Sequence, residues 1–200
     1  FNLYTLFIFN TTIEDERIMK NDKEKVEYEL IEIKQKKTTT IFDTDEGPRE
    51  GQSMEKLAKL RPCFVKGGTV TAANSSSLND GAAAVVVMSK EKAEELGVTP
   101  KVKIEGYAIA GFDAELMGYS PKFSSEKLAD KLGLDLKSID MFEINEAFAS
   151  QAYAVSRDLG LDPEKVNIYG GGISIGHPIG ATGAMLTVKV MYELMRTDKK

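Results

Sequence analysis

The sequence predicts an α/β fold with a largely parallel sheet that is covered on both faces. Short β-branched runs such as AAAVVVM (82–88) have the composition of strands buried on both faces. Helical segments that end in glycine, such as SSEKLADKLG (124–133), lie between these runs. Because strands and helices alternate along the chain, we expect βαβ units in the fold.

The first part of the chain contains few expected elements. VEYELIEI (26–33), within a segment crowded with mixed charge, is predicted to be an exposed strand. A polar loop at 37–52 precedes a short helix at 53–60, which stops before Pro62. A glycine turn and a small polar stretch then lead into the apolar run at 82–88.

From residue 89 onward, helices and strands alternate regularly. Ser89 is the expected N-cap of a helix that ends at Gly97. The other expected strands are 102–111, 139–144 and 166–172, and the other expected helices are 124–133, 147–159 and 178–195.

Composition and charge exclude several classes of function. The 200 residues have a net charge of -5 and a pI near 5.1, which argues against a nucleic-acid or anionic-membrane surface. The apolar start FNLYTLFIFN is shorter than the about 20 residues that span a bilayer and lacks a signal-peptide pattern. The single cysteine, Cys63, indicates a reducing compartment, so we expect a cytoplasmic protein. One histidine and one cysteine, far apart, predict no metal site.

The only histidine, His177, lies between two runs of glycine in GGGISIGHPIG (170–180). It precedes Pro178 and is expected to be the N-cap of the long helix, whose positive end favours a neutral ring. A neutral imidazole that faces a pocket is a candidate general base. A polar cap in a tight turn explains the same residue equally well.

Two more stretches of small polar residues follow expected strands or turns, where open α/β sheets bind ligands. In NEAF (145–148), Asn145 is either a helix N-cap or a donor toward an oxyanion. NSSSLNDG (74–81) is either a network of side-chain turns or part of a site. The glycines before His177 could instead cradle a dinucleotide, with Glu193 as its acidic partner, but their spacing does not match that motif.

Together, NEAFA and GGGISIGHPIGATGA resemble the paired signatures of the thiolases, the acetyl-CoA acetyltransferase family. The similarity extends through MGYSP, GTVTAANSSSLNDGAA and TDEGPREGQSMEKLAKLRP and covers residues 24–200. It implies a layered α-β-α-β-α fold that is incomplete at both ends. Residues 1–98 would be a remnant of the N-terminal domain with part of the loop domain, and residues 99–200 a C-terminal domain without its last strands.

The resemblance implies a reversible Claisen condensation of two acetyl-CoA to acetoacetyl-CoA and CoA, or thiolysis of a 3-ketoacyl-CoA. His177 would activate a cysteine nucleophile and donate to an oxyanion hole, whose water Asn145 would hold. Acetyl-CoA and acetoacetyl-CoA would be the ligands, with no further cofactor. The intact protein would be a homo-oligomer, either a dimer or a tetramer.

The resemblance also implies roles in substrate binding for five residues. The acyl pocket would be lined by three of them, Met117, Phe148 and Gly176. Ser76 would contact the pantetheine arm of CoA. Arg49 would contact the nucleotide, because a guanidinium can stack on adenine or pair with phosphate.

Neither of the two cysteines that thiolases use has a counterpart in this sequence. The motifs C-[SG]-G and C-x-G-G-G are both absent, and Cys63 matches neither position. A base without its nucleophile retains little catalysis, so we expect the chain alone to be inactive. Because the sequence begins with Phe1 rather than methionine and stops at RTDKK, which resembles a surface turn, we expect both of its ends to be truncations. A non-catalytic acyl-CoA-binding or assembly subunit is the alternative function.

Overall fold

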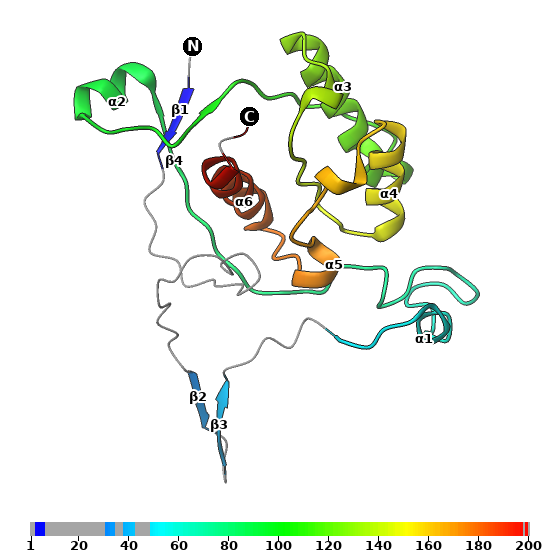
Figure 1. The fold of residues 1–200 in the computed structure, drawn as a ribbon. Helices are drawn as coiled ribbons and strands as arrows, with labels where there is room; N and C mark the ends of the chain where they lie inside the picture. The colour runs from blue at the N-terminus through cyan, green and yellow to red at the C-terminus, as the bar shows by residue number, and fades with distance from the viewer. Residues whose placement is uncertain (1–2, 7–30, 35–37, 43–48, 198, 200) are drawn as a thin grey trace.

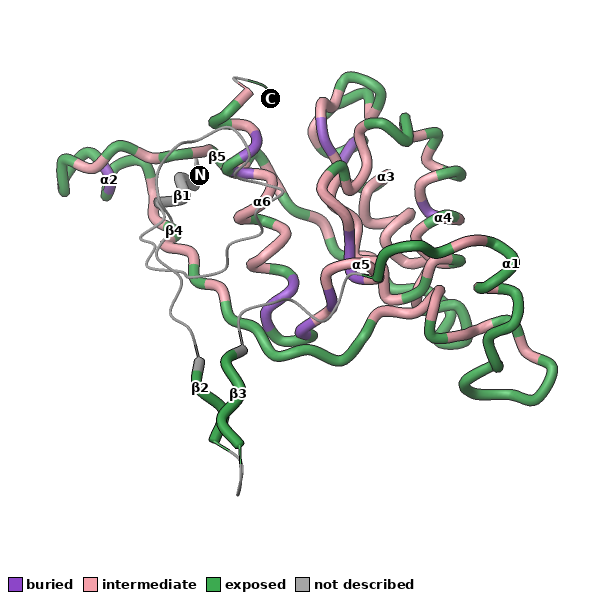
Figure 2. Tube along the Cα trace, turned by 60° about the horizontal axis from the view of Figure 1, so that its bottom comes forward, coloured by how far each residue is buried: buried purple, intermediate pink, exposed green. Residues whose placement is uncertain are grey.

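The computed structural model describes residues 3–6, 31–34, 38–42, 49–197 and 199. Its longest helix, α6 (Thr182–Thr197), lies between a small sheet on one side and helices α3 (Ser120–Leu132) and α4 (Ala149–Asp158) on the other (Figures 1 and 2). The one-turn helix α5 (Gly172–Ile175) precedes α6. Helices and strands occur together, as the α/β prediction requires.

The small sheet has the strand order β4–β1–β5, and its strands are Val86–Ser89, Leu3–Leu6 and Val102–Ile104. β1 is antiparallel to both neighbours, so the predicted parallel sheet is wrong for the described strands. β4 and β5, joined by α2 (Lys90–Leu96), run in the same direction, as a βαβ unit requires, but β1 lies between them. Val87 is 43% exposed, so β4 is not buried on both faces as predicted.

A separate hairpin of β2 (Ile31–Lys34) and β3 (Thr39–Phe42) projects away from the helices (Figure 1). It confirms the end of the exposed strand predicted at 26–33, of which residues 26–30 lie outside the described part. The polar loop predicted from residue 37 is wrong at β3. TTIF consists of β-branched and aromatic residues, which favour a strand when a partner such as β2 is available.

The helix ends that were predicted from the capping residues Ser89, Gly97 and Gly133 are confirmed. Ser89 Oγ accepts the N–H of Lys92 at the start of α2, and Gly97 ends it with a φ of 64°. Ser53 caps α1 (Met54–Leu57) in the same way, and Gly133 ends α3 with a φ of 63°. Six-residue η1 (Ala114–Tyr119), a 3-10 helix, precedes α3.

The strands predicted at 139–144 and 166–172 are not formed. One parallel bridge joins Phe142 to Val166, and the N–H of Phe142 donates to the Lys165 carbonyl at 2.8 Å. A strand forms only where its backbone has partners along its length, and in the described residues these segments pair at this bridge alone. The short 3-10 helices η2 (Leu136–Ser138) and η3 (Pro163–Lys165) precede the two segments.

The core lies mainly around α3, α4 and α6, where the buried segments are concentrated (Figure 2). Among the residues that the structure describes, Val155 of α4 and Met191 of α6 are the largest fully buried side chains. Many apolar side chains before residue 120 are exposed, including Met54, Phe64, Leu78 and Ile109. Among the described residues, no helix has the length and apolar character needed to cross a membrane.

Candidate active site

His177 lies before a turn and is not the N-cap of α6, which corrects the prediction. The Pro178 carbonyl accepts the N–H groups of Ala181 and Thr182 at 2.8 and 2.9 Å, and α6 begins only at Thr182. Gly176 has a φ of 97°, and a Cβ there would lie 2.4 Å from the Asn79 amide carbon. This position therefore requires glycine, and the close approach lets Asn79 Oδ1 accept the His177 N–H at 3.3 Å.

Both ring nitrogens of His177 have hydrogen-bond partners. Nδ1 lies 2.7 Å from Thr182 Oγ1, and Nε2 lies 3.2 Å from Asn145 Nδ2. The prediction that NEAF and the glycine-rich stretch belong to one site is supported by this contact. The other amide atom, Asn145 Oδ1, is buried and has no hydrogen-bond partner among the described residues.

The small polar stretch at 74–81 joins the other two stretches. The N–H of Ser76 donates to the Ala147 carbonyl at 3.0 Å, and the N–H of Ala149 donates to the Asn74 carbonyl at 2.9 Å. Two residues further along, Leu78 forms a parallel bridge with His177. All three stretches that the sequence singled out therefore meet, although two of the strands expected to position them are loops.

Glu146, which the sequence analysis did not single out, fixes the glycine loop before His177. Its carboxylate accepts from Asn167 Nδ2 at 2.8 Å and from the N–H of Ile173 at 3.2 Å. A Cβ at Gly171 would lie 2.2 Å from the carboxylate carbon of Glu146. The glycine thus makes room for a carboxylate, and an acidic residue beside Asn145 in NEAF was the available signal.

A buried ion pair, also missed, ties the segment before Asn145 to α6. Lys189 Nζ lies 2.8 Å from Glu143 Oε2 and also donates to the Gly170 carbonyl at 2.8 Å. The two side chains are only 10% and 2% exposed. Burial raises the pKa of Glu143 above its ordinary value, and the neighbouring Lys189 ammonium opposes that rise.

The predicted substrate-binding residues are spread over several elements. Phe148 lies at the start of α4 and packs edge-on against Phe64, with ring centroids 6.4 Å apart. Met117 is 74% exposed on η1, which packs against α4. Arg49 and Cys63 are also exposed. Among the described contacts, none joins Arg49, Met117 or Cys63 to His177.

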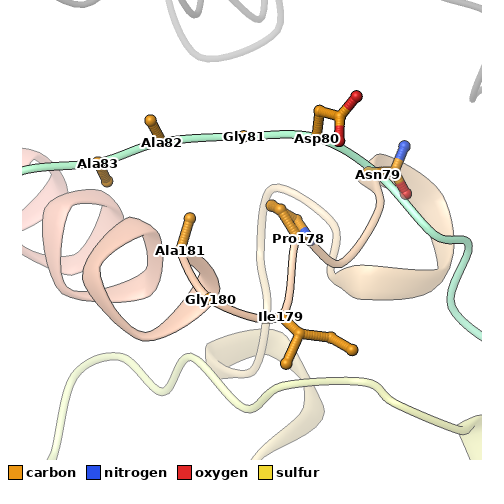
Figure 3. A pocket seen from close by; sticks show the side chains of 9 residues that line it. All are labelled: Asn79, Asp80, Gly81, Ala82, Ala83, Pro178, Ile179, Gly180 and Ala181. Atoms are coloured by element: carbon orange, nitrogen blue, oxygen red, sulfur yellow. The ribbon is translucent and has the colours of Figure 1, made fainter.

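A shallow pocket of about 370 Å³ lies beside the His177 turn (Figure 3). Two short segments line it, Asn79–Ala83 and Pro178–Ala181. Neither His177 nor Asn145 lines this pocket, and none of the five residues predicted to bind substrate does, although Asn79–Gly81 and Pro178–Gly180 belong to two of the stretches named from the sequence. Within the described chain, no cluster of three or more candidate metal ligands is found.

Glu193 does not fit the dinucleotide alternative. It is 7% exposed and bound by Tyr169 and Arg196, whose hydroxyl and guanidinium lie 2.7 Å from its two carboxylate oxygens. Burial disfavours its charged form, but the hydrogen bonds from Arg196 and Tyr169 outweigh burial and hold its pKa below the ordinary value. Its carboxylate is therefore already occupied by these partners.

Two family models match almost the whole chain. The thiolase N-terminal domain matches residues 15–91, and the thiolase C-terminal domain matches residues 98–200. The chain belongs to the thiolase family, whose members are acyltransferases. The predicted domain boundary between residues 98 and 99 stays a prediction. The roles predicted for individual residues also stay predictions.

Relatives and solved structures agree with this assignment. The chain is 52% identical over 172 residues to an acetyl-CoA acetyltransferase of Syntrophomonas wolfei, covering 85% of this chain and 43% of that protein. It resembles the crystal structure of the Bacillus anthracis acetyl-CoA acetyltransferase with a TM-score of 0.76 at 47% identity, covering 86% of this chain and 43% of that one. Human mitochondrial 3-ketoacyl-CoA thiolase in complex with CoA gives a TM-score of 0.75 at 42% identity, covering 80% and 41%. The thiolase-like fold is thereby confirmed, and the chain spans less than half the length of these proteins.

Proposed function

We propose that this chain supplies the histidine-bearing wall of an acetyl-CoA C-acetyltransferase. The reaction would be the reversible condensation of two acetyl-CoA to acetoacetyl-CoA and CoA. The observation that carries the proposal is the contact between His177 Nε2 and Asn145 Nδ2 at 3.2 Å, which unites the two sequence signatures in one site. The relatives named as acetyltransferases favour this enzyme over the alternative of a non-catalytic subunit.

In the proposed acyl transfer, His177 Nε2 takes the proton of a cysteine thiol. The thiolate attacks the carbonyl carbon of acetyl-CoA, forming a bond between that carbon and the cysteine sulfur. The bond between the carbon and the CoA sulfur then breaks, and the imidazolium returns its proton to the CoA thiolate. The amide of Asn145, whose Nδ2 lies 3.2 Å from Nε2, would donate toward the oxyanion, directly or through a water.

We propose the same ligands and the same assembly that the resemblance implies. Acetyl-CoA and acetoacetyl-CoA would be the ligands, no nucleic acid or further cofactor would take part, and the intact cytoplasmic protein would be a dimer or tetramer. The exposed apolar side chains before residue 120 support burial against additional protein, because single domains rarely leave so many uncovered.

A chimera tests the proposal because it supplies the cysteines. The 172 matched residues of the Syntrophomonas wolfei enzyme are replaced by those of this chain, and thiolysis of acetoacetyl-CoA is followed by absorbance. We expect activity, with a loss of about 10²–10⁴-fold in His177→Ala and no such loss in the surface control Lys137→Ala. The 200-residue chain alone should be inactive. Equal activity of the chimera and its His177→Ala variant would refute the role of His177.

A further inference from the structure

The partners of His177 define where the proton of its neutral ring lies. In the orientation that the structure shows, Asn145 Nδ2, which can only donate, lies 3.2 Å from Nε2, so in this arrangement Nε2 offers its lone pair. The ring proton is therefore on Nδ1, which faces Thr182 Oγ1 at 2.7 Å. Thr182 must then accept this hydrogen bond.

Thr182 can accept because its own hydroxyl proton is used elsewhere. Its Oγ1 donates to the Pro178 carbonyl at 3.0 Å, and its backbone N–H donates to the same carbonyl at 2.9 Å. The residue is only 8% exposed, so water has little access to compete for the hydroxyl. The turn that leads from His177 into α6 thus orients the hydroxyl.

The amide of Asn145 imposes no comparable restriction. Rotation of its side chain by half a turn would present Oδ1, which is buried without a partner, to an Nε2–H group. Asn145 can therefore serve either tautomer of His177. The hydroxyl of Thr182 is bound to the turn, so Thr182 is the partner that selects between the tautomers.

We propose that Thr182 is a positioning residue that holds His177 as the Nδ1–H tautomer, so that the lone pair is on Nε2, the nitrogen that would act as the base. This inference rests on the proposed function for its use, since a base at Nε2 has a purpose only if a thiol lies beside it. After Nε2 takes a proton, Nδ1–H keeps its hydrogen bond to Thr182. The same contact thus serves the neutral ring and the imidazolium.

The tautomer can be measured directly because His177 is the only histidine in the 200-residue chain. Long-range ¹H–¹⁵N correlation spectra of the ¹⁵N-labelled chain, at about pH 8 where an ordinary histidine is neutral, give one set of ring signals. We expect a pyrrole-like Nδ1 and a pyridine-like Nε2 in the wild-type chain. The reverse pattern would overturn the proposal. No substrate is needed, so this result is separate from success or failure of the acetyltransferase assay.

Three variants separate tautomer selection from general effects on folding. Thr182→Val keeps the side-chain shape and removes the hydroxyl, so the Nε2 signal should shift toward a pyrrole-like nitrogen. Thr182→Ser restores the hydroxyl and should restore the wild-type pattern. Thr187→Val is the matched control, since the Thr187 hydroxyl also donates to a carbonyl of α6, that of Gly183, but does not contact the ring. A wild-type pattern in Thr182→Val, or a shift as large in Thr187→Val, would overturn the proposal.

If Thr182→Val does not fold, the Thr182→Ser variant still decides the question. Serine keeps the hydroxyl and loses only the methyl group of a residue that is 8% exposed. A folded Thr182→Ser chain with a pyridine-like Nε2 supports selection by the hydroxyl. A pyrrole-like Nε2 in that folded chain contradicts it.

Discussion

Residues 120–197 and residues 49–119 differ in how far their apolar side chains are buried. Of the six hydrophobic residues that are buried in the described part of the chain, five (Ala129, Met141, Val155, Ala181 and Met191) lie in the later region, and one, Ala93, lies in the earlier one. The earlier region exposes more of its large apolar side chains, among them Leu78, which is 91% exposed, although Tyr153 and Ile179 of the later region are exposed as well. The proposed base and its partners lie in the packed region, whereas three of the predicted CoA-binding residues, Arg49, Ser76 and Met117, lie in the exposed one.

This difference separates the region that holds the proposed base from the region that contains three of the residues predicted to bind the substrate. The His177 ring is fixed by Asn145 and Thr182, and the loops around it are fixed by Glu146 and the Glu143–Lys189 pair. All of these contacts are made between described residues, although Asn145 Oδ1 and Glu143 Oε1 are buried without a hydrogen-bond partner among them. Of the residues predicted to bind the substrate, Arg49, Met117 and Phe148 are exposed, so we expect further protein to be required to close the site.

The largest effect is expected at the buried ion pair of the packed region. Glu143→Gln leaves the Lys189 ammonium buried without its counter-ion and should lower the free energy of unfolding by about 3–5 kcal/mol. Urea denaturation of the whole chain measures this change. The double variant Glu143→Leu with Lys189→Met removes both charges and should cost far less. A double variant as unstable as the single one would show that the pair is not the cause.

A matched pair of methionines tests the contrast in packing. Met191→Ala removes a side chain that is 2% exposed and should destabilise the chain by about 2–5 kcal/mol. Met54→Ala removes the same atoms from a side chain that is 75% exposed, so its effect should be within about 0.5 kcal/mol. Both are measured by urea denaturation. Equal losses would contradict the difference between the two regions.

The smallest effect concerns the contact between η1 and the end of α4. The Arg157 guanidinium, and then the Tyr119 hydroxyl, lower the pKa of Asp158 to about 2. Because the folded-state pKa is lower than the ordinary value of about 3.9, ionised Asp158 adds stability above about pH 4, which is lost as the pH falls toward about 2. Tyr119→Phe should raise the pKa of Asp158, measured by carboxylate NMR. Tyr153→Phe is the control, in which we expect no change in the pKa of Asp158. A pKa of Asp158 at its ordinary value in the wild-type chain would contradict the contact.

Local signals in the sequence predicted more of the helices than of the sheet. Ser89 and Gly97 set the bounds of α2 because caps depend only on adjacent residues. The pairing of β1 between β4 and β5 could not be predicted, because strand order depends on contacts distant in sequence. The segment at 139–144 has strand composition but forms a single bridge, since composition does not supply a neighbouring strand.

The site was predictable in part for the same reason. His177 and Asn145 were found from their motifs, and the structure brings them together. Thr182 and Glu146 were missed because their role depends on a turn and on a glycine loop whose shapes are tertiary features. The expected N-cap at His177 was wrong because the turn after Pro178 delays the start of α6 to Thr182.

The most direct test of the central claim, that His177 activates a cysteine thiol, is the alkylation rate of that thiol in the chimera. A Cys63→Ser background removes the exposed cysteine of this chain from the measurement. We expect iodoacetamide to react with the nucleophilic cysteine at about pH 6 at least about tenfold faster than in the His177→Ala variant, because the thiolate is the reactive form. Equal rates in the two proteins would contradict the claim.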